Sequence, residues 1–182
     1  MRTVVWTRID GMGMELATLS PATASAHTME GTVIVVSDAT PFVIRYGVEL
    51  DEGWQTRRVQ INGSRAAETF QIELVAEESV WRRNGEALPQ FDGCVDIDLG
   101  FSPSTNTLPI RRCAASVGER IDVTAVWLRF PELTLERLDQ SYERISERSY
   151  LYRSATGFET TIEVDDHGLV LNYPQGWKAL AT

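Results

Sequence analysis

The sequence predicts a mainly β protein, in which a long antiparallel sheet curls as a roll around a single short α-helix at about residues 106–116. Runs of alternating apolar and polar residues are separated by turn residues at intervals of roughly 8–12, a spacing typical of all-β domains. Only residues 100–116 offer a good candidate for a buried helix. A sheet of about a dozen or more strands curls, splits or closes, and a short helix would cover its concave face.

Strand patterns in the first half of the chain are clearest at residues 42–50, where every second residue from Phe42 to Leu50 is apolar. The continuous apolar run at 31–36 predicts a strand buried on both faces. In the strand expected at 54–62, Arg57 shares a face with the apolar positions, so we expect it to point toward them and Arg58 toward water.

Two Asn-Gly dipeptides, at residues 62–63 and 84–85, predict hairpin turns, because both residue types tolerate the positive φ that such turns require. Residues 133–145 are ambiguous: their apolar side chains recur at helical spacing, but the preceding strand favours another strand, which is our prediction.

The helix is expected to begin near Asn106 or Thr107 and to end near Ser116, with Gly118 closing it in a left-handed conformation. Pro109 fits the first turn, where a missing N–H costs nothing. Candidate N-cap hydroxyls are those of Ser102, Ser104, Thr105 and Thr107.

Composition indicates one domain spanning residues 1–182 with an ordinary globular content of 43% hydrophobic and 24% charged residues. A net charge of −9 disfavours nucleic acid and anionic membrane surfaces as partners. The N-terminal residues lack the apolar core of a signal peptide and no run is long enough to span a membrane, so a cytoplasmic location is expected.

The two cysteines, Cys94 and Cys113, have no metal-ligand or redox spacing and are expected to be reduced and mostly buried. His27 and His167 are isolated, so we expect no metal site. No phosphate-binding glycine loop or nucleophile elbow is present, so no cofactor and no catalytic residue is predicted.

Several stretches resemble the signature of a bacterial family named putative glycolipid-binding, formerly a domain of unknown function. They are residues 54–57 (WQTR), 81–85 (WRRNG), 93–98 (GCVDID), 104–112 (STNTLPIRR), 140–142 (QSY), 166–170 (DHGLV) and 173–174 (YP). The central motif includes Asp96, Asp98, Thr105, Asn106 and Pro109. The chain departs from the family pattern at Ser104 and Cys113, where Phe and Leu are expected, and at residues 175–177.

This resemblance implies a spiral β-roll, in which a long antiparallel sheet wraps around one helix, and it implies homodimers. The architecture is similar to that of the periplasmic carriers of bacterial lipoproteins. The family's function name rests on this similarity of shape, and proteins that share a fold often differ in function.

Arg57, Arg111 and Arg112 are candidates for binding an anionic headgroup, because a guanidinium offers a bidentate fork to phosphate or carboxylate. The alternative is that these arginines pair internally with Asp96 and Asp98. The two aspartates lie two apart on one strand face, a separation of about 7 Å that would also suit a carboxylate-based hydrolase.

Aromatic residues provide the second group of ligand-binding candidates: Trp54, Trp81, Trp127 and Tyr142, with Trp6 as a further aromatic residue of the same kind. Such side chains pack protein cores more often than they bind ligands. Three functions therefore stay open. The first is a non-enzymatic protein that holds a lipid or glycolipid-like amphiphile between sheet and helix. The second is a homodimeric interaction module with a filled core, and the third is the hydrolase.

Overall fold

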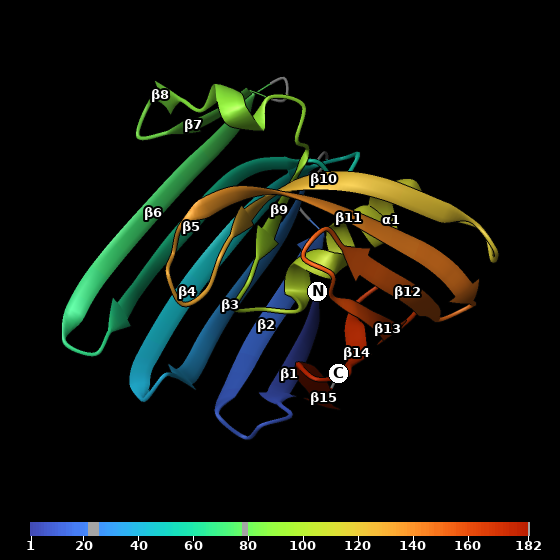
Figure 1. The fold of residues 1–182 in the computed structure, drawn as a ribbon, viewed down its shortest axis with the longest axis horizontal. Coiled ribbons are helices and arrows are strands. Elements are labelled where there is room, and N and C mark those ends of the chain that lie inside the picture. Colours follow the sequence, from blue (N-terminus) through green and yellow to red (C-terminus); the bar gives the residue numbers. More distant parts are fainter. Residues whose placement is uncertain (22–25, 78–79, 182) are drawn as a thin grey trace.

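A computed structural model describes residues 1–21, 26–77 and 80–181. Its secondary structure is almost entirely β (Figure 1). The strands before the helix are β1 (Arg2–Arg8), β2 (Gly13–Pro21), β3 (Ala26–Ser37), β4 (Thr40–Asp51), β5 (Thr56–Arg65), β6 (Glu68–Glu77), β7 (Val80–Arg83), β8 (Glu86–Ala87) and β9 (Asp96–Leu99). The 3₁₀ turns η1 (Pro89–Phe91) and η2 (Ser104–Asn106) flank β9, and helix α1 (Thr107–Cys113) follows. The remaining strands are β10 (Arg120–Leu128), β11 (Leu135–Ser146), β12 (Ser149–Ser154), β13 (Glu159–Val164), β14 (Val170–Tyr173) and β15 (Trp177–Ala181).

All 15 described strands form one sheet in the order β8-β7-β6-β5-β4-β3-β2-β1-β15-β14-β13-β12-β11-β10-β9. Neighbouring strands are antiparallel except β9 and β10, which are parallel. The sheet curls around α1, and Figure 1 shows the helix between the N-terminal strands and the strands β10–β13. The mainly β roll with one short helix is therefore confirmed.

The inner end of the spiral is β9, which lies against β5 as well as β10. The backbone N–H of Thr56 donates to Val95 O at 3.0 Å, and the N–H of Ile97 donates to Thr56 Oγ1 at 3.1 Å. These two bonds fix the position of the strand that leads directly into η2 and α1.

Strand β4 follows the predicted pattern: its alternate side chains from Phe42 to Leu50 are all buried, between 0% and 4% exposed. Strand β3 does not, because Ile34 is 61% exposed while Val33 and Val35 are buried. The apolar run 31–36 was thus wrongly predicted to be buried on both faces; a sheet curled around one core covers only its concave face. Residues 135–146 form a strand, as predicted, with Leu138, Gln140 and Tyr142 on its buried face.

Of the two Asn-Gly hairpins, only the one at residues 84–85 is confirmed, with φ values of 51° and 85°. The turn predicted at Asn62-Gly63 is wrong, because both residues lie inside β5. Gly63 pairs with Phe70 across the sheet, and a Cβ at this position would lie only 2.5 Å from the Phe70 ring. The glycine thus makes room for a neighbouring ring, and the chain reverses after Arg65, where Ala66 has φ 51°.

The helix is shorter than the predicted 106–116. Its end is set by Ala114, which has φ 45° and donates its N–H to Ile110 O, so the prediction that Gly118 closes the helix is wrong. The prediction that a hydroxyl caps its start is also wrong. Thr105 Oγ1 accepts the N–H of Leu99 at 3.1 Å and Thr107 Oγ1 donates to Gly168 O at 2.9 Å, so these hydroxyls bind other segments of the chain.

The orientation predicted for Arg57 is wrong as well. Leu50 pairs with Thr56 and Glu49 pairs with Arg58, which leaves Arg57 as the extra residue of a β-bulge. The bulge turns Thr56 inward, and the side chain of Arg57 is 42% exposed, as is that of Arg58.

Candidate functional site

Asp96 and Arg112 form a buried ion pair between β9 and the last turn of α1. Their side chains are 2% and 16% exposed, and Arg112 Nη1 donates to Asp96 Oδ1. Burial raises the pKa of Asp96, and the hydrogen bond and charge of Arg112 oppose that rise. The pair holds the helix against β9. Arg112 is therefore paired inside the protein with Asp96, which was the alternative to binding a headgroup. Arg57 pairs instead with Asp51, at 2.5 Å.

Asp98, two residues further along β9, belongs to a different network. Its Oδ2 accepts a hydrogen bond from Gln140 Nε2, which also lies 3.0 Å from the hydroxyl of Tyr152. Burial raises the pKa of Asp98 to about 6, the Gln140 hydrogen bond opposes the rise, and the charge of Asp96 adds to it. At pH 7 the Asp98 carboxyl group is therefore ionised in most molecules.

A cavity of about 340 Å³, called here the aromatic pocket, opens beside Asp98. It lies where the segment 98–106 meets strands β10, β11, β12, β14 and β15. Its wall carries polar and aromatic side chains. The polar ones are Arg8, Asp98, Ser102, Asn106, Ser154, Thr156 and Gln175, and the aromatic ones are Trp127, Tyr152, Phe158, Tyr173 and Trp177.

Three of these rings form one cluster. The ring centroids of Tyr152, Phe158 and Tyr173 lie 5.9 to 6.3 Å from one another, at interplanar angles of 52° to 65°. Phe158 and Tyr173 are partly exposed. Burial raises the pKa of both tyrosines, so their hydroxyls stay protonated and are available as donors. The wall thus combines apolar ring surface with a carboxylate and hydroxyl groups.

Of the four aromatic residues predicted to bind a ligand, only Trp127 lines this pocket. Trp81 is fully buried and donates its indole N–H to Cys94 O at 2.8 Å. Tyr142 is 1% exposed and donates its hydroxyl to Asn106 Oδ1 at 3.0 Å. Both residues are therefore part of the core.

Trp54, 9% exposed, packs against His27 and Arg111 and lines none of the described cavities. The ring of His27 stacks on it with centroids 4.2 Å apart, and the guanidinium of Arg111 lies 5.1 Å from the ring centroid. Arg57, Arg111 and Arg112 thus bind three different partners, and no described cavity is lined by all three.

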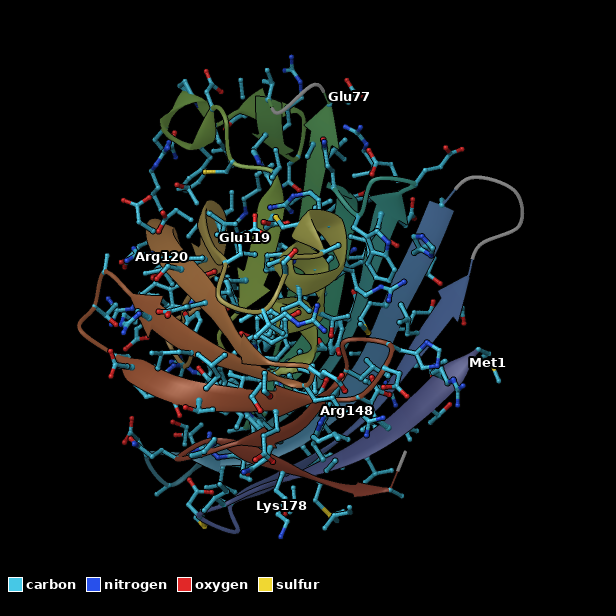
Figure 2. The ribbon with its side chains drawn as sticks, turned by 90° about the vertical axis from the view of Figure 1, so that its right-hand side faces the viewer. Met1, Glu77, Glu119, Arg120, Arg148 and Lys178 are labelled. Atoms are coloured by element: carbon cyan, nitrogen blue, oxygen red, sulfur yellow. The ribbon has the colours of Figure 1, made fainter. Side chains whose placement is uncertain are left out.

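A second cavity, of about 510 Å³, lies near the end of α1 and is lined by Arg111, Arg144 and Arg148. The β11–β12 turn that carries Arg148 faces the viewer in Figure 2. Arg148 pairs with Asp166 at 2.7 Å, and Arg144 donates to three backbone carbonyls. Since Glu147, Asp165 and Asp166 share the same wall, this cavity is not a cationic site.

Sequence reasoning missed four of the pocket's aromatic residues, Tyr152, Phe158, Tyr173 and Trp177. It also missed a buried polar cluster beside the pocket, formed by Glu15, Tyr46, Ser102 and Ser104. The signal for Glu15 was present, because it shares the inner face of β2 with Ala17 and Leu19.

Cys113 is an exposed residue, contrary to prediction, while Cys94 is buried as predicted, and neither forms a disulfide. Across residues 1–21, 26–77 and 80–181 no group of three or more His, Cys, Asp or Glu residues is arranged to hold a metal ion. None of the helices in this part of the chain has the length and apolar character needed to cross a membrane.

A family model described as "Putative glycolipid-binding" matches residues 3–179. Among solved structures, the chain is similar to a DUF1089 family protein from Pseudomonas aeruginosa, with 30% sequence identity and a TM-score of 0.80; the match covers 90% of this chain and 89% of that one. No curated protein matches the chain. Sequence motifs, the family model and the shared roll agree, and the chain therefore belongs to the putative glycolipid-binding family.

Proposed function

We propose that this chain is a non-enzymatic binding protein for a glycolipid-like amphiphile, and that it binds the saccharide head in the aromatic pocket. The proposal rests mainly on the position of Asp98 in the pocket wall and on its hydrogen bonding. One of its carboxylate oxygens is held by Gln140, while Oδ1 accepts no hydrogen bond from any residue of the described ranges. A carboxylate that lines a cavity and is held at one oxygen can accept a ligand's hydroxyl group at the other.

The rest of the pocket wall suits a sugar. A saccharide ring presents hydroxyl groups at its edge and C–H groups on its faces, and aromatic rings pack well against apolar faces. Asn106 adds an amide to the wall, and Tyr152 and Tyr173 add hydroxyls. A volume of about 340 Å³ lies at the lower end of the range for small-ligand sites, about 300–1,000 Å³, which favours a small head over a whole lipid.

The packing between α1 and the sheet supports a head-only mode of binding. Leu108 on the helix and Trp6, Leu169 and Val170 around it are each at most 1% exposed. An acyl chain between helix and sheet would have to displace these side chains, so the proposal leaves the ligand's tail outside the core.

The family description names glycolipid binding, which agrees with this chemistry. Catalysis is not part of the proposal, because Asp96 does not line the pocket and is paired with Arg112. A hydrolase of the two-carboxylate type needs both acids at the substrate.

The test is calorimetric titration of the protein with hexyl glucoside, hexyl galactoside and hexyl phosphocholine, each below its micelle concentration. We expect one of the glycosides to bind and Asp98→Asn to weaken that binding about 10-fold or more, the cost of a hydrogen bond to a charged group. Asp122→Asn, at an exposed aspartate outside the pocket, is the matched control and should bind as wild type does. Binding should also weaken as pH falls through about 6, since protonation removes the carboxylate acceptor. Equal affinity of Asp98→Asn and wild type would overturn the assignment.

A second candidate function, self-association as a homodimer, is favoured by the outer face of the sheet. Met14, Ile34 and Val43 are adjacent across β2, β3 and β4 and are 50%, 61% and 37% exposed. Leu16 extends this apolar row on β2. Contiguous exposed apolar surface commonly marks an interaction site.

Sedimentation velocity tests this candidate. If the apolar row is a dimer interface, Ile34→Glu should convert dimers to monomers, while Ile145→Glu, at another exposed isoleucine on β11, should not. A wild-type protein that stays monomeric over a wide concentration range would rule the dimer out.

The cytoplasmic location inferred from the N-terminal residues stays a prediction.

A further inference from the structure

Four buried oxygens form a closed ring beside the aromatic pocket. Glu15 Oε1 lies 2.5 Å from the hydroxyl of Tyr46 and 2.7 Å from Ser102 Oγ. Ser104 Oγ completes the ring, at 2.8 Å from the Tyr46 hydroxyl and 2.7 Å from Ser102 Oγ. Each of the four residues is between 0% and 7% exposed.

The number of protons decides which form of Glu15 fits this ring. Each hydroxyl has one proton to donate. If Glu15 is ionised, three hydroxyl protons serve four short contacts, and one contact has no hydrogen bond. If Oε1 carries a proton, four protons serve four contacts, and every ring oxygen donates once and accepts once.

The second oxygen of Glu15 supports the same form. Oε2 is buried and has no hydrogen-bond partner among the described residues. An ionised carboxylate would leave this oxygen charged and unsolvated, which is far more costly than leaving a neutral carbonyl oxygen without a donor. Strand β3, between β2 and β4, leaves space for Tyr46. The phenol group of Tyr46 occupies the position that a Cβ of Gly31 would take.

We propose that Glu15 is a neutral acid that closes this ring and so acts as the positioning residue for one wall of the aromatic pocket. The ring joins β2 and β4 to the segment 102–104, and Ser102 itself lines the pocket two residues from Ser104 and four from Asn106. The inference deepens the proposed function and rests on it for the link to ligand binding.

The surroundings of Glu15 agree with a neutral form. Burial raises its pKa to about 8, while the hydrogen bonds from Tyr46 and Ser102 oppose the rise. Tyr46 is the one titratable group of the described chain in contact with it, and its own pKa is raised by burial and by the charge that Glu15 would carry. The groups that the segment 102–104 brings to the ring are hydroxyls and backbone.

The first test compares unfolding by urea of wild type and Glu15→Gln from pH 5 to pH 8. The pKa of Glu15 is higher in the folded state than its usual 4.5, so stability is full at low pH and falls as pH rises toward about 8. Relative to Glu15→Gln, the wild-type unfolding constant should rise about 100-fold or more over this interval. Glu49→Gln, at an exposed position of β4, should follow wild type. Parallel pH profiles of wild type and Glu15→Gln would overturn the proposal.

The second test separates the ring from burial alone, and it still applies if Glu15→Gln does not fold. The infrared carbonyl band of a protonated carboxyl group is followed against pH in wild type and in Ser104→Ala. Opening the ring removes the extra hydrogen bond of the neutral form, so Glu15 should titrate at a lower pH in Ser104→Ala. An unchanged titration midpoint would show that burial alone keeps Glu15 neutral.

The third readout is the affinity for the glycoside that binds best. It should weaken in wild type as pH rises through about 8, but not in Glu15→Gln. If no glycoside binds at any pH, the proposed function fails, while the unfolding and infrared tests still decide whether the ring holds a neutral acid. If glycoside binds with the same pH profile in both proteins, the positioning role is refuted.

Discussion

Replacing Arg112 by Met tests the buried ion pair that ties the helix to the inner strand. Asp96 is 2% exposed, and its Oδ2 already lacks a partner within the described part of the chain. Removing Arg112 leaves the whole carboxylate buried and unpaired, and breaking a pair of this kind costs about 3–5 kcal/mol. For a domain of this size that corresponds to a fall in melting temperature of about 10 °C.

The pH dependence of this cost identifies its cause. Without Arg112, only burial acts on Asp96, so its pKa in the folded state rises further. A raised folded-state pKa means that stability is retained at low pH and lost as pH rises. Arg112→Met should therefore be more destabilised at pH 8 than at pH 5, and adding Asp96→Asn should recover much of the loss.

Urea unfolding of wild type, both single variants and the double variant provides the double-mutant cycle. Asp96→Asn alone should cost less than Arg112→Met, because the guanidinium of Arg112 is 16% exposed and reaches water more easily than Asp96 does. A cost below about 1 kcal/mol for Arg112→Met, equal at both pH values, would refute the reasoning. Glycoside affinity should be unchanged, since Arg112 does not line the aromatic pocket.

The remaining predictions concern packing and accessibility. Gly63→Ala should destabilise the fold by about 1–3 kcal/mol in urea unfolding, because its Cβ would meet a ring at 2.5 Å and a backbone oxygen at 2.7 Å; Gly47→Ala, with nothing within 4 Å, is the control. Trp81→Phe should cost about 1–3 kcal/mol, since the carbonyl that accepts its indole N–H becomes unsatisfied; a cost near zero would contradict this. A maleimide reagent followed by mass spectrometry should modify Cys113 in the native protein and Cys94 only after unfolding; equal rates would contradict their assigned burial.

Local patterns in the sequence predicted much of the sheet but not its interruptions. The alternation from Phe42 to Leu50 identifies both the strand and its buried face, because the side-chain period of a strand is two. The same rule failed at Arg57, where the bulge opposite β4 shifts the period by one residue. It also failed at Gly63, whose role depends on a ring in the neighbouring strand and not on its own turn propensity.

The candidate site was harder to predict because it is made by long-range contacts. Asp98 was singled out from the motif, and Trp127 from its residue type, but their partners Tyr152 and Tyr173 come from strands brought alongside by the curl of the sheet. Nothing local distinguishes those tyrosines from core residues. Glu15 did carry a local signal, a carboxyl group on the inner face of a strand, and a search for polar residues at apolar positions would have found it.

Saturation-transfer NMR with the best-binding hexyl glycoside tests the central claim most directly, because it measures which protons of the ligand contact the protein. We predict strong transfer to the sugar ring protons and weak transfer to the terminal methyl group of the chain, with the sugar signal lost in Asp98→Asn. Transfer that is strongest at the hexyl chain, and insensitive to Asp98, would show that the protein holds the tail and not the head.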